Sequence, residues 1–111
     1  MIKVKGNYKD DRLDGLVEWY YENGQLKRKE NYKDGKEDGL WETYDANGQL
    51  ERKGNWKDGR PDGLWKSYHE NGHLWIKTNY KDGKQDGLQK YFNDDGSLKK
   101  TQTWRDGVKQ K

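Results

Sequence analysis

Apolar and aromatic residues in this chain occur in short runs that alternate with polar residues, and a Gly-containing turn signal separates each run from the next. One set of turns carries Asn-Gly or Asp-Gly, at 23–24, 47–48, 71–72 and 95–96. A second set carries Asp-Gly, at 34–35, 58–59, 82–83 and 106–107. Such pairs between alternating runs are the strongest short-range signals for a β-hairpin. The pattern therefore predicts a succession of short antiparallel strands.

A 24-residue pattern repeats along nearly the whole chain without an insertion. A motif of Asn, an aromatic residue, Lys and Asp starts at positions 7, 31, 55 and 79, and a degenerate copy starts at 103. An Asp-Gly-Leu motif follows in each copy, at 14–16, 38–40, 62–64 and 86–88. A fixed period of this length is typical of repeat architectures. We therefore divide this single repeat domain (1–111) into a half-unit (1–6), four units (7–30, 31–54, 55–78 and 79–102) and a second half-unit (103–111).

The strand register follows if each turn is a three-residue loop, a type I turn that closes on a Gly in the left-handed region. In the second unit the first loop is then Ala46-Asn47-Gly48, with Tyr44 opposite Leu50. The next loop is Lys57-Asp58-Gly59, with Trp56 opposite Arg60. A slip of one residue moves every side chain of a strand to the other face, so this assignment decides which residues are buried.

Under this register one face carries a ladder of Leu and aromatic residues, which we expect to be the core: Tyr32, Leu40, Tyr44, Leu50 and Trp56 in the second unit. The second face carries rings among Lys, Glu and Gln: Val17, Trp19, Tyr21, Trp41, Trp65, Trp75 and Tyr91. The predicted fold is all-β, a repetitive antiparallel β-hairpin meander. Strand twist should curl this single sheet into an open roll.

Composition supports a thin structure with an unusual core. Only 28% of the chain is hydrophobic and 39% is charged, but it contains six Trp and eight Tyr. A two-layer globule of this size needs more aliphatic residues, so large amphipathic rings must supply the core. The chain has no Cys, which excludes disulfides and thiolate metal sites. No apolar run approaches the length of a membrane span, and no apolar signal region begins the chain, so we expect a cytoplasmic protein.

The string from Asp38 to Leu50 (Asp-Gly-Leu-Trp-Glu-Thr-Tyr-Asp-Ala-Asn-Gly-Gln-Leu), followed by Asn-Trp-Lys-Asp-Gly at 55–59, resembles the MORN repeat. It is most similar to the variant associated with the antitoxin partner of bacterial toxin–antitoxin systems, and the resemblance covers nearly the whole chain. It implies a curved sheet of stacked hairpins that serves as a scaffold, binds protein partners or contacts membrane lipid. The first unit departs from the pattern because its Trp is Trp19, and the fourth because Gln89 replaces a typical Trp.

The second face supplies the candidate binding residues: Val17, Trp19, Trp41, Trp65, Trp75 and Tyr91. Trp65 and Trp75 lie diagonally across one predicted hairpin, where two rings can clamp a sugar ring, a choline-like cation or a peptide. The alternative is that curling or self-association buries these rings, because a thin sheet must cover large rings somewhere. We predict a protein partner, a toxin in the antitoxin-like case, or a second copy of the chain on this face.

Basic residues concentrate at the end of the chain: Lys99, Lys100, Arg105, Lys109 and Lys111. Against Asp106 they give residues 97–111 a net charge of +4, compared with +3 for the whole chain. This segment is the candidate contact with anionic phospholipid at a membrane surface. Acidic residues in nearly every turn argue against nucleic acid as the ligand.

Catalysis, metals and cofactors find no support in the sequence. The string His69-Glu70-Asn71-Gly72-His73 matches the zinc-protease pattern H-E-x-x-H, but that chemistry requires a helix and this string spans a predicted turn. The Asp-rich turns lack the spacing of calcium loops. Nearly every polar residue recurs once per unit, whereas catalytic residues occupy singular positions, so we predict a non-enzymatic protein. Near-identical units with half-unit ends also fit an engineered array without a native ligand.

Overall fold

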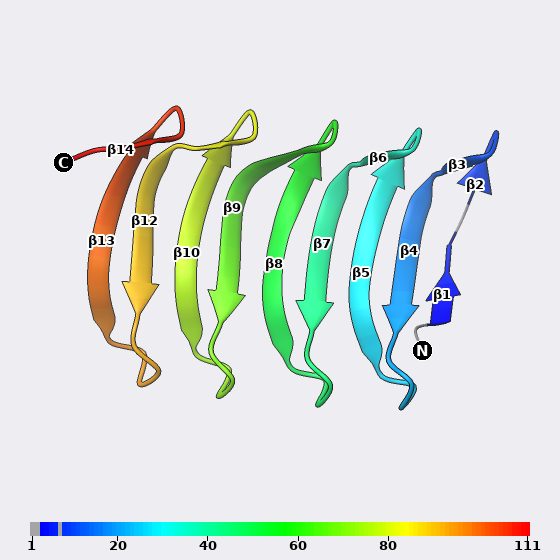
Figure 1. Cartoon of the computed structure of the whole chain (residues 1–111), viewed down its shortest axis with the longest axis horizontal. Coiled ribbons are helices and arrows are strands. Elements are labelled where there is room, and N and C mark those ends of the chain that lie inside the picture. Colours follow the sequence, from blue (N-terminus) through cyan, green and yellow to red (C-terminus); the bar gives the residue numbers. More distant parts are fainter. Residues whose placement is uncertain (1–2, 7) are drawn as a thin grey trace.

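The computed structural model describes residues 3–6 and 8–111 and shows an open antiparallel sheet (Figure 1). The strands are β1 (Lys3–Lys5), β2 (Tyr8–Lys9), β3 (Arg12–Leu13), β4 (Gly15–Tyr20), β5 (Leu26–Lys33), β6 (Lys36–Glu37), β7 (Gly39–Tyr44), β8 (Leu50–Lys57), β9 (Arg60–Tyr68), β10 (Leu74–Lys81), β11 (Lys84–Gln85), β12 (Gly87–Phe92), β13 (Leu98–Arg105) and β14 (Val108–Lys109). Met1, Ile2 and Asn7, which belong to the predicted first half-unit and first motif copy, lie outside the described residues.

The main sheet has the order β1-β4-β5-β7-β8-β9-β10-β12-β13-β14, so its strands lie side by side in the order of the sequence, without a crossover. Short strands β6 and β11 extend the turns after β5 and β10, and β2 pairs with β3 in a separate ribbon. The two chain ends lie at opposite edges of the sheet (Figure 1). This arrangement confirms the predicted all-β hairpin meander.

The Asn-Gly turns adopt the predicted three-residue loop. In the second unit the amide of Asp45 donates to the carbonyl of Gln49 at 2.9 Å, and Gly48, at φ 85°, donates to Asp45 at 3.0 Å. Tyr44 pairs with Leu50, as predicted. A Gly in the left-handed region closes such a loop without steric cost.

The Asp-Gly turns differ from the prediction, because they are two-residue loops. Lys57 pairs with Arg60, and Trp56 pairs with Pro61 instead of Arg60. Both central residues have positive φ, 49° at Asp58 and 80° at Gly59. This is the type I′ geometry, whose backbone twist matches that of the strands it connects. The predicted three-residue loop is therefore wrong at this end of the sheet.

Each hairpin also contains a β-bulge that the sequence did not reveal. In the second hairpin Tyr44 pairs with Leu50, but Thr43 pairs with Arg52, which leaves Glu51 as the extra residue. The same irregularity occurs in the other hairpins, at Lys27, Trp75 and Lys99. A bulge shifts the alternation of side chains by one residue, as does the shorter Asp-Gly turn. The two shifts cancel over a whole unit, so the predicted faces are reversed only between the bulge and the following Asp-Gly turn.

The predicted core face is consequently wrong. Tyr32 and Trp56 lie on the same face as Trp41, whereas the leucines of the Asp-Gly-Leu motifs lie on the opposite face and are 36–48% exposed. We call these the aromatic face and the leucine face. The most buried side chains line the aromatic face: Val17, Glu30, Trp65, Thr78 and Gln89. The core of the protein is therefore the aromatic face.

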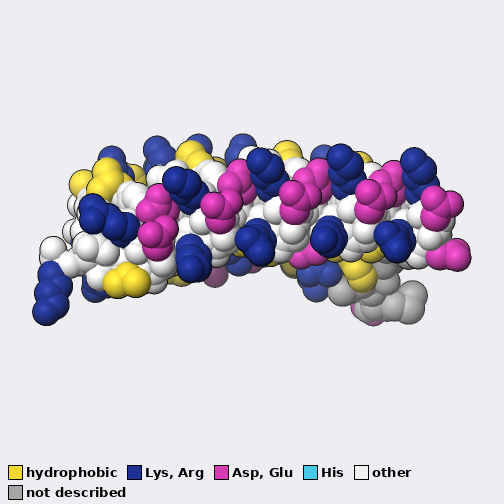
Figure 2. All heavy atoms as spheres, turned by 90° about the horizontal axis from the view of Figure 1, so that it is seen from above, with side chains coloured by type: hydrophobic (Ala, Val, Ile, Leu, Met, Phe, Trp, Pro, Cys, Tyr) yellow, Lys and Arg dark blue, Asp and Glu magenta, His cyan; other side chains and the backbone are white. Residues whose placement is uncertain are grey.

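The molecule measures 46 × 32 × 16 Å, and its shortest dimension is that of a single curved sheet. Hydrogen bonds between successive turns tie the hairpins together at both ends of the strands. At one end Gly59 donates to the carbonyl of Glu37 at 2.9 Å, and at the other Tyr21 Oη donates to the carbonyl of Tyr44 at 2.8 Å. Figure 2, which looks onto the end with the Asp-Gly turns, shows basic and acidic side chains alternating along it.

Candidate functional site

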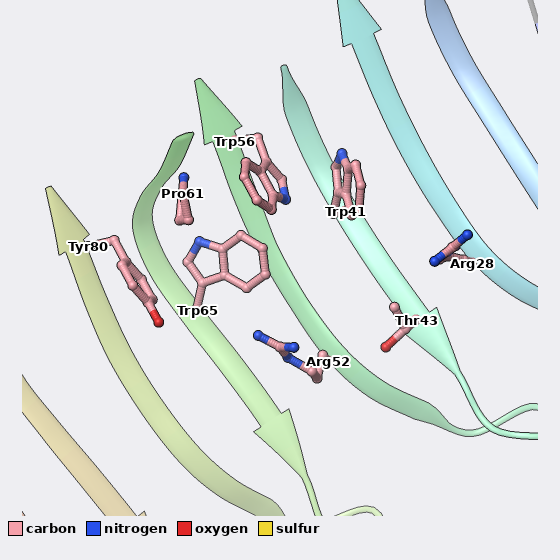
Figure 3. Close-up of a pocket in the computed structure, with 8 residues that line it drawn as sticks. All are labelled: Arg28, Trp41, Thr43, Arg52, Trp56, Pro61, Trp65 and Tyr80. Atoms are coloured by element: carbon pink, nitrogen blue, oxygen red, sulfur yellow. The ribbon is translucent and has the colours of Figure 1, made fainter. Parts of the chain in front are cut away.

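A groove of about 400 Å³ crosses the middle of the aromatic face, and we call it the aromatic groove (Figure 3). Strands β5, β7, β8, β9 and β10 line it with Arg28, Trp41, Thr43, Arg52, Trp56, Pro61, Trp65 and Tyr80. Five neighbouring strands thus contribute one or two side chains each. This arrangement follows from the repeat, because equivalent residues of successive units lie side by side.

Five rings form a continuous row along the groove. Ring centroids are 5.9 Å apart from Tyr32 to Trp41, 5.2 Å to Trp56, 5.5 Å to Trp65 and 6.0 Å to Tyr80. The ring planes are tilted or nearly perpendicular to one another, which is the preferred geometry of aromatic pairs. The row therefore presents alternating ring faces and edges to a ligand.

The row fits because one position in it has no side chain. Gly54 lies directly under the indole of Trp65, and a Cβ atom at this position would overlap the ring. The equivalent positions of the neighbouring units carry Glu30 and Thr78. Gly54 is therefore needed for the close approach of Trp65, which is only 9% exposed.

The groove also contains an indole N–H without a hydrogen-bond partner. The indole nitrogens of Trp41 and Trp65 donate to the carbonyls of Asn31, at 3.4 Å, and Asn55, at 3.0 Å. The indole nitrogen of Trp56 is buried and has no hydrogen-bond partner among the described residues. A buried donor without a partner is costly, so an acceptor that displaced the atoms covering this N–H would gain a hydrogen bond.

A cation lies at the side of the rings. The guanidinium carbon of Arg52 is 5.5 Å from the ring centroid of Trp65, and the Arg52 side chain is exposed. No salt bridge joins Arg52 to a carboxylate within the part of the chain that the structure describes. The groove therefore offers a guanidinium beside apolar rings, which suits a carboxylate or a carbonyl oxygen.

At the N-terminal end of the groove, Glu30 organises a buried polar cluster that we call the Glu30 network. Its carboxylate accepts from Trp19 Nε1 at 2.6 Å and from Tyr32 Oη at 3.4 Å, and it pairs with Arg28 Nε at 3.4 Å. Arg28 also stacks on the Trp19 ring at 4.7 Å. Burial and the Glu30 charge raise the pKa of Tyr32 to about 12, because both oppose formation of the phenolate.

At the C-terminal end, Gln89 interrupts the row of rings. Its amide nitrogen donates to Thr78 Oγ1 at 3.0 Å, and its amide oxygen accepts from Trp104 Nε1 at 2.9 Å. Gln89 is 7% exposed and occupies the position that Trp41 and Trp65 hold in the central units. The departures noted in the sequence at the first and fourth units thus mark the two ends of the aromatic groove.

Only some of the residues predicted to bind a partner lie close together in the structure. Val17, Trp19, Trp41, Trp65 and Tyr91 lie on the aromatic face, but only Trp41 and Trp65 line the groove. Trp75 is 45% exposed, lies 5.5 Å from the His69 ring and lines a separate hollow of about 490 Å³ with Tyr91, Lys99 and Lys100. Trp65 and Trp75 thus line different hollows, which leaves no shared clamp between them.

The predicted lipid-contact residues are dispersed. Lys99 and Lys100 follow Leu98 at the start of strand β13, and Arg105 ends the strand, so the two groups lie at opposite ends of it. Lys100 stacks on the Tyr91 ring at 4.6 Å, whereas Lys109 pairs across the last turn with Trp104. All five cations, including Lys111, are exposed, but they do not form one patch.

The histidines of the H-E-x-x-H string serve a turn. The backbone of His69 donates to the carbonyl of His73 at 2.8 Å, and the His69 ring bonds with the carbonyl of Phe92 at 2.8 Å. Within the described ranges, no group of three or more His, Cys, Asp or Glu side chains could hold a metal ion. The same part of the chain contains no helix long and apolar enough to cross a membrane.

Several groove residues escaped the sequence analysis: Arg28, Thr43, Arg52, Trp56, Pro61 and Tyr80. The available signal was their recurrence, since Arg28 and Arg52 occupy one repeat position, and Trp56 and Tyr80 another. Recurrence is also what a purely structural role produces, and a register without the bulge at Glu51 places Trp56 on the other face. The residues that line this groove are therefore the same residues that form the core of the sheet.

Comparison with known families adds one finding. The model of the family described as MORN repeat variant matches residues 13–34, 37–58, 61–82 and 85–106, which together make up most of the chain. Successive matches start 24 residues apart, as does the repeat in the sequence. No curated protein matches the chain.

Proposed function

Because this chain belongs to the MORN repeat family, a family of binding repeats, we propose that it is a non-enzymatic scaffold whose aromatic groove holds an extended segment of a protein partner. The observation that carries the proposal is the buried Trp56 N–H without a partner, in a groove of ordered rings beside an exposed Arg52. An extended peptide supplies what this groove lacks. Its free backbone carbonyls can accept from Trp56, and its apolar side chains can enter the spaces between rings.

A toxin polypeptide is the most specific form of this partner. This form rests on the resemblance to antitoxin-like MORN variants and on nothing in the groove itself. It requires that the captured protein be harmful when produced alone and harmless when produced with this chain. Any other single protein held in the groove still satisfies the scaffold proposal.

The test is capture of partners from a lysate of the source organism on the immobilised protein. The parent, the double variant Trp41→Ala/Trp65→Ala and the control Trp75→Ala are compared. Trp75 provides a matched control because it lies outside the groove and is exposed. We expect one protein that the parent and the control retain and the double variant loses. Retention by all three would reject the groove as the binding site.

A milder variant separates binding from folding. Trp56→Phe keeps an aromatic ring in the row but removes the N–H, so the fold should persist. Titration of the captured partner by calorimetry should show roughly five- to tenfold weaker binding, which is the effect of one lost hydrogen bond. Unchanged affinity would mean that the Trp56 N–H meets no acceptor in the complex.

Self-association and lipid contact are the alternative functions, and separate measurements test them. Sedimentation at increasing protein concentration would reveal a second copy as the occupant of the groove. Co-sedimentation with phosphatidylserine vesicles would reveal lipid contact that weakens steeply with salt. The dispersed positions of Lys99, Arg105 and Lys109 favour the protein partner over the membrane. An empty capture, with neither alternative observed, would fit an engineered array without a native ligand.

A further inference from the structure

A single row of charged residues crosses the middle of the leucine face. Directly paired residues of successive strands form it, so each side chain lies beside the next. From β4 to β13 the row contains Glu18, Lys29, Glu42, Lys53, Lys66, Lys77, Lys90 and Thr101. The row alternates in sign as far as Lys53, and from Lys53 to Lys90 it consists of four consecutive lysines. We call these four, Lys53, Lys66, Lys77 and Lys90, the lysine ladder.

The lysine ladder opposes the stability of the sheet. Lys53 pairs with Lys66, Lys66 with Lys77, and Lys77 with Lys90. Like charges directly opposite one another on neighbouring strands repel and destabilise the pair. All four side chains are half-buried, which limits the screening of their charges by solvent.

The fold does not impose this repulsion. Lys66 and Lys90 occupy the repeat position that Glu18 and Glu42 occupy in the first two units, where each Glu pairs with a Lys on both neighbouring strands. The same sheet therefore accommodates alternating charges at the same place. An unfavourable feature that the architecture could avoid is typical of a binding site.

Apolar residues border the lysine ladder on both sides. Leu64 and Leu88 follow one side and are 36% and 48% exposed, while half-buried Tyr68 and Phe92 follow the other. Pairing of Tyr68 with Leu74 and of Phe92 with Leu98 adds leucines to that second border. Asn79 lies between Leu64 and Leu88, so the first border is mixed, whereas the second is apolar throughout. The complement of this surface is a negative stripe with one apolar flank and one mixed flank.

The spacing of the ladder indicates the shape of that complement. Neighbouring strands lie about 4.8 Å apart, so the four lysines extend over roughly 14 Å. Acidic residues placed once per turn on an α-helix recur every 5.4 Å or so, which gives about 16 Å over three turns. In an extended strand, acids on one face recur at about 6.7 Å and soon lose register with the ladder. The helix is the better match.

We propose that the lysine ladder is a docking site for an acidic amphipathic helix of a partner protein, laid across strands β8, β9, β10 and β12. Glutamates or aspartates on one side of the helix pair with the four lysines, and apolar residues beside them contact Leu64, Leu88, Tyr68 and Phe92. The site lies on the opposite face from the aromatic groove and does not depend on it.

A membrane or a nucleic acid fits this face less well. A flat anionic bilayer lying on the leucine face would also meet Glu18 and Glu42 in the same row, and these repel it. A phosphate backbone would find the lysines but would leave the exposed Leu64 and Leu88 in contact with charged groups. A helix that covers only the second half of the row avoids both problems.

The test uses a fluorescent synthetic peptide of about 20 residues, long enough to form a helix in solution. Its Glu residues form one stripe flanked by Leu, and a control peptide has the same composition with the Glu residues spread around the helix. Fluorescence anisotropy with the full chain should give at least roughly tenfold tighter binding of the striped peptide, since several partly buried ion pairs act together. Equal binding of both peptides would overturn the proposal.

Charge reversal in the ladder supplies the second arm. Lys66→Glu/Lys90→Glu restores the alternation of the first two units, whereas Lys99→Glu/Lys109→Glu makes the same charge change outside the ladder. We expect the first variant to lose roughly tenfold or more in affinity for the striped peptide and the second to retain it. The urea midpoint of the first variant should equal or exceed that of the parent, which distinguishes lost docking from unfolding.

Three further results would overturn the proposal. These are retained peptide binding by Lys66→Glu/Lys90→Glu, equal loss in both charge variants, and a parent that binds phosphatidylserine vesicles or polyuridylate through the ladder more tightly than the striped peptide. The last result would assign the ladder to a membrane or to RNA. The Trp56→Phe variant, which alters the groove but keeps a ring in the row, should bind the striped peptide as the parent does, so the ladder and the aromatic groove can fail independently.

Discussion

In the central hairpins Trp41 and Trp65 close the aromatic face, whereas in the first hairpin Val17 occupies the equivalent position and Trp19 lies two residues further on. In the central hairpins the rings pack against one another at centroid distances of 5.2 to 6.0 Å. The packing in the first hairpin buries a carboxylate, Glu30, which is 2% exposed. It accepts hydrogen bonds from Trp19 and Tyr32 and forms a salt bridge with Arg28. One backbone thus supports an apolar core in one place and a polar network in another.

The comparison explains why a single-layered protein can vary its repeats. Each position on the aromatic face contacts mainly the positions before and after it in the row, so a change needs a compensating change in one neighbour only. Gly54 compensates for Trp65, and Glu30 compensates for the displaced indole of Trp19. The fourth unit uses a third combination, in which Gln89 bonds with Thr78 and Trp104. The compensating pairs, more than the residues themselves, define the groove and its ends.

The largest expected effect comes from breaking the central stack with Gly54→Val. The new side chain would overlap the indole of Trp65, and the neighbouring strands prevent the backbone from yielding. Displacing a buried Trp forfeits most of its packing, so unfolding should become easier by about 3–4 kcal/mol. Urea denaturation followed by tryptophan fluorescence measures this loss.

The matched control is Thr78→Val, which places the same side chain at the same repeat position one unit later. Only the hydrogen bond with Gln89 is lost there, so the cost should be about 1 kcal/mol. Similar losses in the two variants would show that Trp65 adapts to a side chain under its ring. The special role of Gly54 would then be rejected.

The next largest effect is expected from Glu30→Leu, which disrupts the Glu30 network. Trp19 Nε1 and Tyr32 Oη lose their acceptor, and the Arg28 guanidinium loses its carboxylate. Leaving buried donors unpaired should destabilise the fold by about 2–3 kcal/mol, with Arg28 limiting the loss because its side chain is 35% exposed. Thermal unfolding compared with the exposed-turn control Glu70→Leu measures the effect. A loss no greater than that of the control would mean that the network contributes nothing.

The repeat and the hairpin meander were predictable because turn signals and periodicity are local properties of the sequence. The Asn-Gly turns also followed from local rules, as Tyr44 opposite Leu50 shows. The assignment of faces failed because two features shift the alternation by one residue. The bulge at Glu51 has no turn residue to mark it, and Asp58-Gly59 is compatible with both a two-residue and a three-residue loop. Since the shifts cancel over 24 residues, the repeat itself gave no warning of either.

The candidate site shows the same limit. Trp41 and Trp65 are predicted as binding residues because the register places their rings on the second face among polar residues. Trp56 was assigned to the opposite face, and its unpaired N–H could not be foreseen, because it depends on which neighbours lack an acceptor. The lysine ladder could not be recognised from sequence either. Lys53 and Lys66 are neighbours only in the observed register.

The smallest expected effect is a shift in the titration of Tyr32, which distinguishes the Glu30 network from the stacked rings of the central hairpins. Burial, followed by the charge of Glu30, raises the pKa of Tyr32 to about 12, compared with 10.0 for an ordinary tyrosine. The neutral phenol is the form that the folded state favours. The contribution of Tyr32 to stability is therefore complete below pH 10 and is lost as the pH rises through 12. Tyrosinate absorbance should show a late component in the parent that is missing in Tyr32→Phe.

Glu30→Gln should move this late component toward lower pH without abolishing the shift, because burial is the larger cause and remains. The glutamine still offers an oxygen to Trp19 Nε1, so the fold persists during the titration. The control Glu70→Gln changes the same charge in an exposed turn and should leave the late component in place. If Glu30→Gln also leaves it in place, the Glu30 charge does not reach the phenol, and burial alone separates Tyr32 from the other tyrosines.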